Sequence, residues 1–242
     1  MKLVWSPETA SKAYIDTVKS VSNLLNKGSD GYLSGSSSPV LTNRFQFDLQ
    51  CELFEESSVA ELVSAMAGGW NPQLIVEAWH RGGIVATSVG LSVASRHTHG
   101  RHVCVVPDER SRSEYVDAMR EVGMTSEVIV GEAEEVMDGL VGVDFLVVDC
   151  RRKDFARILR LAKLSPRGAV LICKNAGSGA SSGFRWRSVL GGGSRVVRSA
   201  FLPVGKGVEI AHVGATGGAP KGRSRWIRHV DQESGEEHLF RR

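Results

Sequence analysis

The sequence predicts an α/β protein with a mostly parallel sheet, helices on both faces and an antiparallel hairpin near its carboxyl end. Two observations lead to this prediction. Between residues 74 and 173, short apolar runs alternate with helical patterns, which is typical of a parallel sheet covered on both faces. Residues 195–213 then hold two apolar runs joined by a turn rich in proline and glycine, which favours a hairpin.

The individual elements follow from apolar spacing and from start and stop signals. Apolar runs predict strands over 74–78, 102–106, 127–130, 144–149 and 169–173. Helical spacing predicts helices over 84–97, 111–123, 133–140 and 155–164. A capping box from Ser111 to Glu114 is expected to begin the second of these helices. Earlier in the chain, Ser6-Pro7-Glu8 starts one helix, and another runs from Ser57 to Gly68-Gly69.

These elements divide the chain into four parts. Residues 1–20 form an N-terminal helix, 21–50 a disordered insertion, 51–213 the α/β domain, and 214–242 a basic linker followed by a tail hairpin. The linker, 214–225, is rich in glycine and expected to be flexible. The tail segments 225–230 and 236–242 flank the turn signal DQESG, which predicts the hairpin.

Composition limits the classes of function. The 242 residues include no apolar run near the roughly 20 that span a bilayer, and the start lacks a signal-peptide pattern. The four cysteines show no CxxC spacing, and three of them, Cys104, Cys150 and Cys173, lie in or beside strand runs. This favours buried, reduced thiols in a cytoplasmic or nuclear protein. The net charge is +3, of which the tail carries +2 (six basic less four acidic residues), so a nucleic-acid-binding core is not indicated.

Acidic residues follow four of the predicted strands. They are Glu77, the pair Asp108-Glu109, Glu132 and Asp149. Ligands of open α/β sheets bind at the carboxyl ends of the strands, and an acid after the second strand suits a ribose diol. The alternative is that these acids are ordinary loop residues, since loops are acidic in general.

Several of these segments resemble the class I S-adenosylmethionine-dependent methyltransferases, most closely the caffeoyl-CoA and catechol O-methyltransferase group. The matching segments are ExWxxxG at 77–83, PDE at 107–109, GEAEEV at 131–136, VVDCRRKDF at 147–155 and LPVGKGVEIA at 202–211. The last is the most specific. The resemblance implies a Rossmann-like methyltransferase fold.

A closer resemblance, over nearly the whole chain except 21–50, is to a plant-specific family of unknown function with a methyltransferase-like fold. It rests on WSPETASKAYIDTVKS (5–20), VGLSVASRHT (89–98), DFLVVDCRRKDFARILRLA (144–162) and SGEEHLFRR (234–242). This family implies no settled activity.

The methyltransferase resemblance implies S-adenosylmethionine as cofactor. It would be surrounded by Glu77, Trp79, Gly83, Asp108, Glu109, Glu132, Ala133 and Asp149. Trp79 departs from the pattern, because it stands where a glycine normally lets the backbone approach the cofactor. Its indole either projects into the methionine end of the pocket, forms a wall, or packs in the core.

The resemblance also implies where a metal would bind, and the sequence departs from it there. The catechol-type enzymes hold Mg²⁺ with an Asp after the fourth strand and an Asp-Asn pair after the fifth; here Asp149 and Asn175 match, but Lys174 replaces the middle ligand. An ammonium repels a hard cation. We therefore expect no metal and an ion pair between Lys174 and Asp149. A catalytic lysine base is the alternative, which such pairing opposes by raising the lysine pKa.

Two further groups have two interpretations each. Arg151-Arg152-Lys153 either meets an anionic ligand or is a solvated charge run. His97, His99 and His102 crowd a helix end away from the strand carboxyl ends, so a solvated or helix-dipole role is favoured over metal binding.

Two functions remain open. One is a metal-independent S-adenosylmethionine-dependent methyltransferase acting on an unknown small molecule. The other is a catalytically inactive methyltransferase-fold protein that serves as a binding or scaffold module, with the tail docking a protein partner. The acids and the glycine turn favour the first, whereas Trp79 and Lys174 favour the second. Nucleic-acid and membrane partners are not indicated.

Residues 21–50 are the segment without a counterpart in the resembled family. Val21-Ser22-Asn23 can be encoded by GTAAGTAAT, a 5′ splice site, and Leu49-Gln50 by TTGCAG, a 3′ splice site. We hypothesise a retained intron, with an ordinary surface loop as the alternative. In either case most of the segment is expected to be exposed and poorly ordered, with loop over 26–44. VSNLLNK is expected to extend the first helix, and Phe45, Phe47 and Leu49 alternate as in an extended segment.

Overall fold

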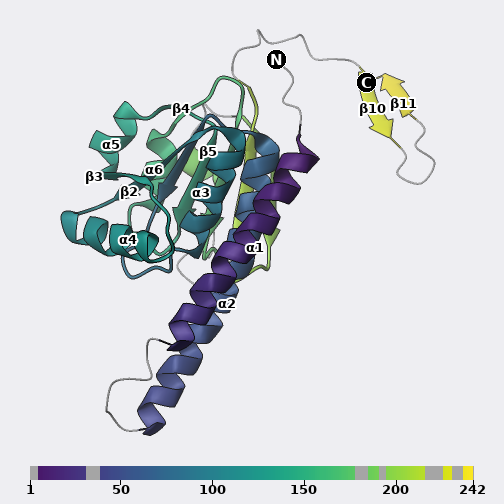
Figure 1. Ribbon diagram of the computed structural model, residues 1–242. Helices are drawn as coiled ribbons and strands as arrows, with labels where there is room; N and C mark the ends of the chain where they lie inside the picture. Colours follow the sequence, from purple (N-terminus) through teal and green to yellow (C-terminus); the bar gives the residue numbers. More distant parts are fainter. Residues whose placement is uncertain are drawn as a thin grey trace.

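The computed structural model describes residues 5–30, 39–177, 185–190, 195–215, 226–230 and 237–241. Its centre is a seven-stranded sheet of order β3-β2-β1-β5-β7-β9-β8 (Figure 1). The strands are β1 (Leu74–Ala78), β2 (Arg101–Val106), β3 (Glu127–Val130), β5 (Phe145–Asp149), β7 (Ala169–Lys174), β8 (Val196–Leu202) and β9 (Val208–Val213). The strands from β3 to β7 run parallel, and β9 runs antiparallel to both β7 and β8. The predicted mostly parallel sheet with a terminal hairpin is confirmed.

Helices cover both faces of this sheet because the central strands bury side chains in both directions. One core places Val76, Leu146 and Leu171 against α5 (Ala133–Gly139), α6 (Phe155–Leu161) and α7 (Trp186–Leu190). The opposite faces of the same strands pack against α1 (Pro7–Asp30), α2 (Pro39–Trp70), α3 (Ala86–Thr98) and α4 (Glu109–Glu121). Continuous apolar runs are what such doubly covered strands require.

α1 and α2 form a long helical pair that extends beyond the sheet (Figure 1). Their close packing depends on a glycine, because a Cβ on Gly68 would lie 2.8 Å from the Cβ of Ala13. Thr17 of α1 also donates a 2.7 Å hydrogen bond to Ser64 of α2.

The structure corrects the loop and extended segment expected within 21–50. α1 continues to Asp30, which includes the predicted extension, and α2 begins at Pro39 and contains Phe45 and Phe47; residues 31–38 lie outside the described residues. Proline suits the first helical position, and no glycine follows until Gly68, so nothing in the sequence stops α2 from growing outward from its packed half. The retained-intron origin stays a hypothesis.

Smaller differences concern helix ends. α4 begins at Glu109 with Asp108 as its N-cap, whose carboxylate accepts a 2.7 Å hydrogen bond from the Ser111 amide, so the predicted capping box at Ser111 is wrong. α6 ends at Leu161, because the next residues form β6 (Lys163–Leu164), which pairs with β4 (Val141–Val143).

In the tail, β10 (Trp226–Val230) and β11 (Glu237–Arg241) pair antiparallel where the sequence predicts a hairpin. Among the described residues, no helix is both long and apolar enough to cross a membrane.

Candidate functional site

The order of the strands determines where this fold has its crevice. β1 lies between β2 and β5, so the chain order reverses between β1 and β5. α3 follows β1 on one face and α6 follows β5 on the other. Helices that leave in opposite directions open a crevice at the carboxyl ends of the two strands, which is the usual ligand position of open α/β sheets.

Arg152 crosses this crevice. It belongs to the loop after β5, and its Nη1 donates to the backbone carbonyls of Trp79 (2.9 Å) and Val105 (3.1 Å), at the ends of β1 and β2. Its Nε and Nη2 donate to the two carboxylate oxygens of Asp154 at 2.8 and 2.7 Å. The side chain is 5% exposed. A buried guanidinium held by two carbonyls and a carboxylate is well satisfied, so Arg152 closes the crevice from within the protein.

Trp79 fills the space beneath the loop that follows β1. It is 3% exposed and belongs to the apolar cluster that includes Val89 of α3 and its N-cap residue Val85. Its ring meets that of Tyr115 at a centroid distance of 5.5 Å in an edge-on arrangement. A Cβ on Gly83 would lie 3.4 Å from the indole nitrogen and 3.5 Å from Nη2 of Arg151. The indole therefore packs in the core, which was one of the three positions expected for it.

Glu77 points into the α3 side of the sheet. Its carboxylate is 1% exposed, accepts a 3.0 Å hydrogen bond from the Ser88 hydroxyl, and lies 3.4 Å from Nε2 of His102. These neighbours belong to α3 and β2, beneath the strand end. The structure thus separates Glu77 from the acids of the neighbouring loops.

A second group of charges lies at the ends of β5 and β7. The Lys174 ammonium is 3.0 Å from Glu56 of α2 and 3.9 Å from Asp149. Asp149 accepts hydrogen bonds from Arg151 (2.8 Å from Nη2) and from the Asn175 amide (3.0 Å). The predicted Lys174–Asp149 pair is present, but Glu56 is the nearer partner, and the sequence analysis missed it.

The pKa shifts of this group follow from burial and pairing. Burial opposes the charge on Lys174, but the carboxylates of Glu56 and Asp149 outweigh it and raise the lysine pKa. Burial likewise opposes the charge on Asp149, yet hydrogen bonds from Arg151 and the charge of Lys174 lower the aspartate pKa. Both shifts favour the charged forms, so a neutral Lys174 acting as a base is not supported.

The remaining predicted site residues lie toward the outside. Asp108 is exposed and caps α4, while the exposed Glu109 pairs with Arg112 at 3.2 Å. Glu132 is exposed at the start of α5, and Ala133 beside it is buried. The structure therefore joins Trp79, Gly83 and Asp149 through Arg151 and Arg152, and leaves the exposed acids at a separate outer rim.

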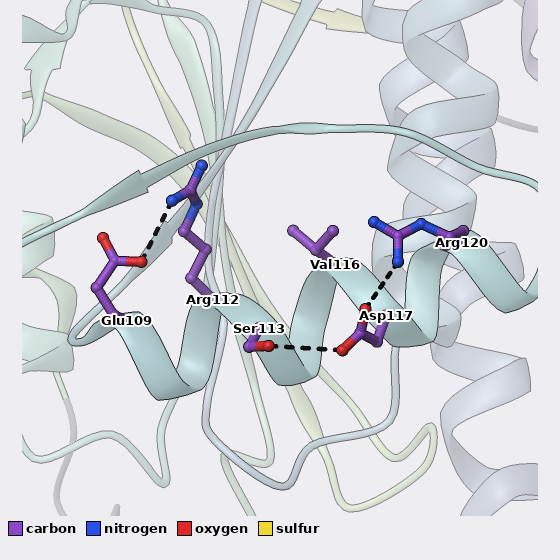
Figure 2. Close-up of a pocket in the computed structure, with 6 residues that line it drawn as sticks. All are labelled: Glu109, Arg112, Ser113, Val116, Asp117 and Arg120. Carbon is purple, nitrogen blue, oxygen red and sulfur yellow. Dashed lines mark hydrogen bonds and ion pairs between the residues drawn. The ribbon is translucent and has the colours of Figure 1, made fainter.

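A hollow on the outer surface of α4 lies outside the crevice. Figure 2 shows its lining along one side of the helix: Glu109, Arg112, Ser113, Val116, Asp117 and Arg120. The lining charges are paired within the helix, Arg112 with Glu109 and Arg120 with Asp117 at 2.9 Å. This neutralised hollow indicates no particular ligand.

The histidines and the charge run differ partly from expectation. His97 pairs with Asp16 at 2.9 Å, and His99 ends α3 with a left-handed backbone (φ 55°). His102 is buried beside Ser92, so a solvated role is wrong for it. Within the charge run only Lys153 is exposed, because Arg151 and Arg152 bind internal acids and carbonyls. The predicted burial of Cys104, Cys150 and Cys173 is confirmed.

Comparison with known proteins agrees with this fold. A family described as a protein of unknown function (DUF1442) matches residues 1–43 and 46–242. The chain belongs to this family. The match includes residues 21–43 and 46–50 and breaks at residues 44 and 45. The prediction that 21–50 has no counterpart in the family is therefore wrong.

Among solved structures, a methyltransferase from Geobacter sulfurreducens matches with a TM-score of 0.53 and 21% identity over 79% of this chain and 96% of its own. A methyltransferase from Podospora anserina, bound to S-adenosylhomocysteine, has a TM-score of 0.48 and 17% identity over 81% and 94%. A putative caffeoyl-CoA O-methyltransferase from Staphylococcus aureus has a TM-score of 0.47 and 15% identity over 80% and 99%. No curated protein matches the sequence. The chain has a class I methyltransferase fold.

S-adenosylmethionine is the cofactor that this fold implies. The outer rim offers exposed acids of the kind that bind a ribose. The crevice itself holds the Arg152 guanidinium, and the room beneath its first loop holds the Trp79 indole. As arranged, the crevice does not fit the cofactor.

Proposed function

We propose that this protein is a methyltransferase-fold protein that has lost catalysis and serves as a binding or scaffold module. The observation that supports this most is Arg152, whose guanidinium reaches from the loop after β5 across the end of β1. It donates four hydrogen bonds, to the Trp79 and Val105 carbonyls and to the Asp154 carboxylate. A ligand entering there would have to displace a buried charge from its carboxylate, at a cost of several kcal/mol.

The charge group at the ends of β5 and β7 adds support. Lys174 and Arg151 balance Glu56 and Asp149, so every charge in this group has an internal partner. A site built for Mg²⁺ needs unpaired oxygen ligands, and we propose that this one binds no metal. The Lys174 ammonium is the cation of this group, and its role is structural.

A specific observation favours a second function, a metal-independent S-adenosylmethionine-dependent methyltransferase acting on a small molecule. The exposed Asp108 and Glu109 follow β2, the position from which an acid binds a ribose diol in related folds. For this function Arg152 would have to swing out of the crevice. No metal would be needed, since aligning a nucleophile with the electrophilic methyl group can suffice.

Thermal-shift and calorimetric titrations with S-adenosylmethionine and S-adenosylhomocysteine separate the two functions. A cofactor at about 100 times its Kd stabilises by about 2.7 kcal/mol, which is readily seen in a melt. We expect no shift with the wild-type protein. Arg152→Ala and Trp79→Gly test whether these side chains block the site, with Lys153→Ala as the exposed neighbour control. Saturable binding to the wild type would support the methyltransferase function instead.

We further propose that the protein works in the cytoplasm or nucleus, where its buried thiols stay reduced. Its partner is a protein bound through the tail or a small molecule, rather than nucleic acid or membrane, in keeping with a weak net charge of +3.

A further inference from the structure

β8 is an open edge of the main sheet. In the described part of the chain it pairs with β9 alone and ends the seven-stranded order. Val197 and Phe201 of β8 are 63% and 51% exposed. An edge with exposed apolar side chains and free backbone groups readily accepts another strand, unless it is covered.

The tail hairpin, β10 and β11, is a second element that would gain stability from pairing with a further strand. β10 and β11 form a separate two-stranded sheet, apart from the main sheet in Figure 1. An isolated two-stranded hairpin is marginally stable in water and gains stability from a third strand. The hairpin therefore has an unpaired edge of the kind that β8 could complete.

The segment between β9 and β10 is long enough for the hairpin to reach β8. The tail leaves the sheet after Val213, which is paired with Val196 at the start of β8. Twelve residues, 214–225, separate Val213 from Trp226, and such a length spans up to about 40 Å. β8 has seven residues, or roughly 23 Å of strand. The connection is thus long enough to bring the hairpin to β8 in either direction.

We propose that the tail hairpin of this same chain docks edge to edge on β8 and extends the main sheet. The hairpin would cover Val197 and Phe201 and supply partners for the outward backbone groups of β8. This inference concerns a different part of the fold from the crevice and does not depend on the proposed loss of catalysis.

Amide hydrogen exchange on the full chain and on a chain ending at Ala215 tests the proposal. We expect the full chain to protect about three more amides in the β8 peptide, since alternate amides of an edge strand point outward. The β10 and β11 amides should also be protected. Equal exchange of β8 in the two chains, or unprotected tail amides, would overturn the docking.

A substitution avoids reliance on the truncation. Val197→Lys places a charge on the proposed contact and should release both β8 and the tail to faster exchange, whereas Val141→Lys, at another strand valine that is 69% exposed, should not. Equal effects of the two substitutions would argue against docking. The mass in solution distinguishes the occupant: a monomer supports docking within one chain, and a dimer that dissociates on tail removal would overturn it in favour of exchange between copies.

Discussion

Removing the Lys174 ammonium should destabilise the fold strongly, because it leaves a buried carboxylate without its cation. Lys174 and Glu56 are 3% and 6% exposed and 3.0 Å apart. Breaking a buried pair of this kind costs about 3–5 kcal/mol. We therefore expect Lys174→Met, which keeps much of the side-chain length, to lower the free energy of unfolding by that amount.

The two carboxylates near Lys174 should not share this loss equally. At an effective dielectric constant of about 20, Coulomb attraction before desolvation is roughly 5.5 kcal/mol at the 3.0 Å separation from Glu56 and 4.3 kcal/mol at the 3.9 Å from Asp149. The two distances alone therefore predict only a small difference between the attractions of Glu56 and Asp149 for Lys174. However, Asp149 keeps the hydrogen bonds of Arg151 and Asn175 when Lys174 is removed. Among the described residues, Glu56 keeps a 3.3 Å hydrogen bond from Thr87 and a longer contact with Arg151.

Urea unfolding of two double-mutant cycles measures the difference. We expect Lys174→Met and Glu56→Gln together to be far less destabilising than the sum of the single changes, with a coupling of about 2–3 kcal/mol. The cycle of Lys174→Met with Asp149→Asn should give a smaller coupling. Additive effects in the first cycle, or a larger coupling in the second, would refute the view that α2 supplies the main counter-charge.

Three other predictions concern single sites. Gly205→Ala should lower the free energy of unfolding, measured by urea denaturation, by about 2–4 kcal/mol, and Gly82→Ala by about 1 kcal/mol. Both glycines have a positive φ (56° and 73°), but only at Gly205 would a Cβ meet α2, 2.7 Å from Val59. Equal losses for the two variants would contradict this. Because the folded pKa of Asp149 is lowered, its contribution to stability is present above the unfolded value of about 3.9 and is lost as pH falls through the folded pKa. Asp149→Asn should therefore flatten the acid limb of stability against pH, and an unchanged limb would exclude the effect. Asp144→Ala should lower the free energy of unfolding, measured by calorimetry, by about 3 kcal/mol. The buried carboxylate accepts hydrogen bonds from the Gln73 and Leu74 amides and from Arg167, and the substitution removes all three. A loss below about 1 kcal/mol would show that water replaces these bonds.

The strands were predictable because their signal is local. The run at 74–78 matches β1, and the run at 144–149 differs from β5 by one residue. Apolar residues at every position mark burial on both faces, and glycine or charged residues end each run. Cap positions were less predictable, since Asp108 and Ser111 are both good N-cap residues three positions apart. In the structure α4 begins directly after Asp108, so Asp108 is the N-cap.

The partners within the site were not predictable from local pattern. Arg152 stands in a run of three basic residues, a pattern typical of solvated surface, and its burial depends on carbonyls at the ends of two other strands. Glu56 lies 118 residues from Lys174, and only the packing of α2 across the sheet brings them together. The helical spacing predicts a helix from Ser57, directly after Glu56, but does not show where along the sheet that helix lies.

Lys174 and Glu56 form one structural unit, because each of them is buried and needs the other's charge. A lysine at the end of β7 is buried whatever its role, and it needs a carboxylate there. Asp149 alone does not meet that need, because its oxygens already accept from Arg151 and Asn175. The second carboxylate must come from another element, and α2 is the one that supplies it. The same contact holds α2 against the ends of β5 and β7. The burial of Lys174 and the closure of this edge by α2 therefore depend on each other, and any opening of the edge would require Lys174 and Glu56 to separate.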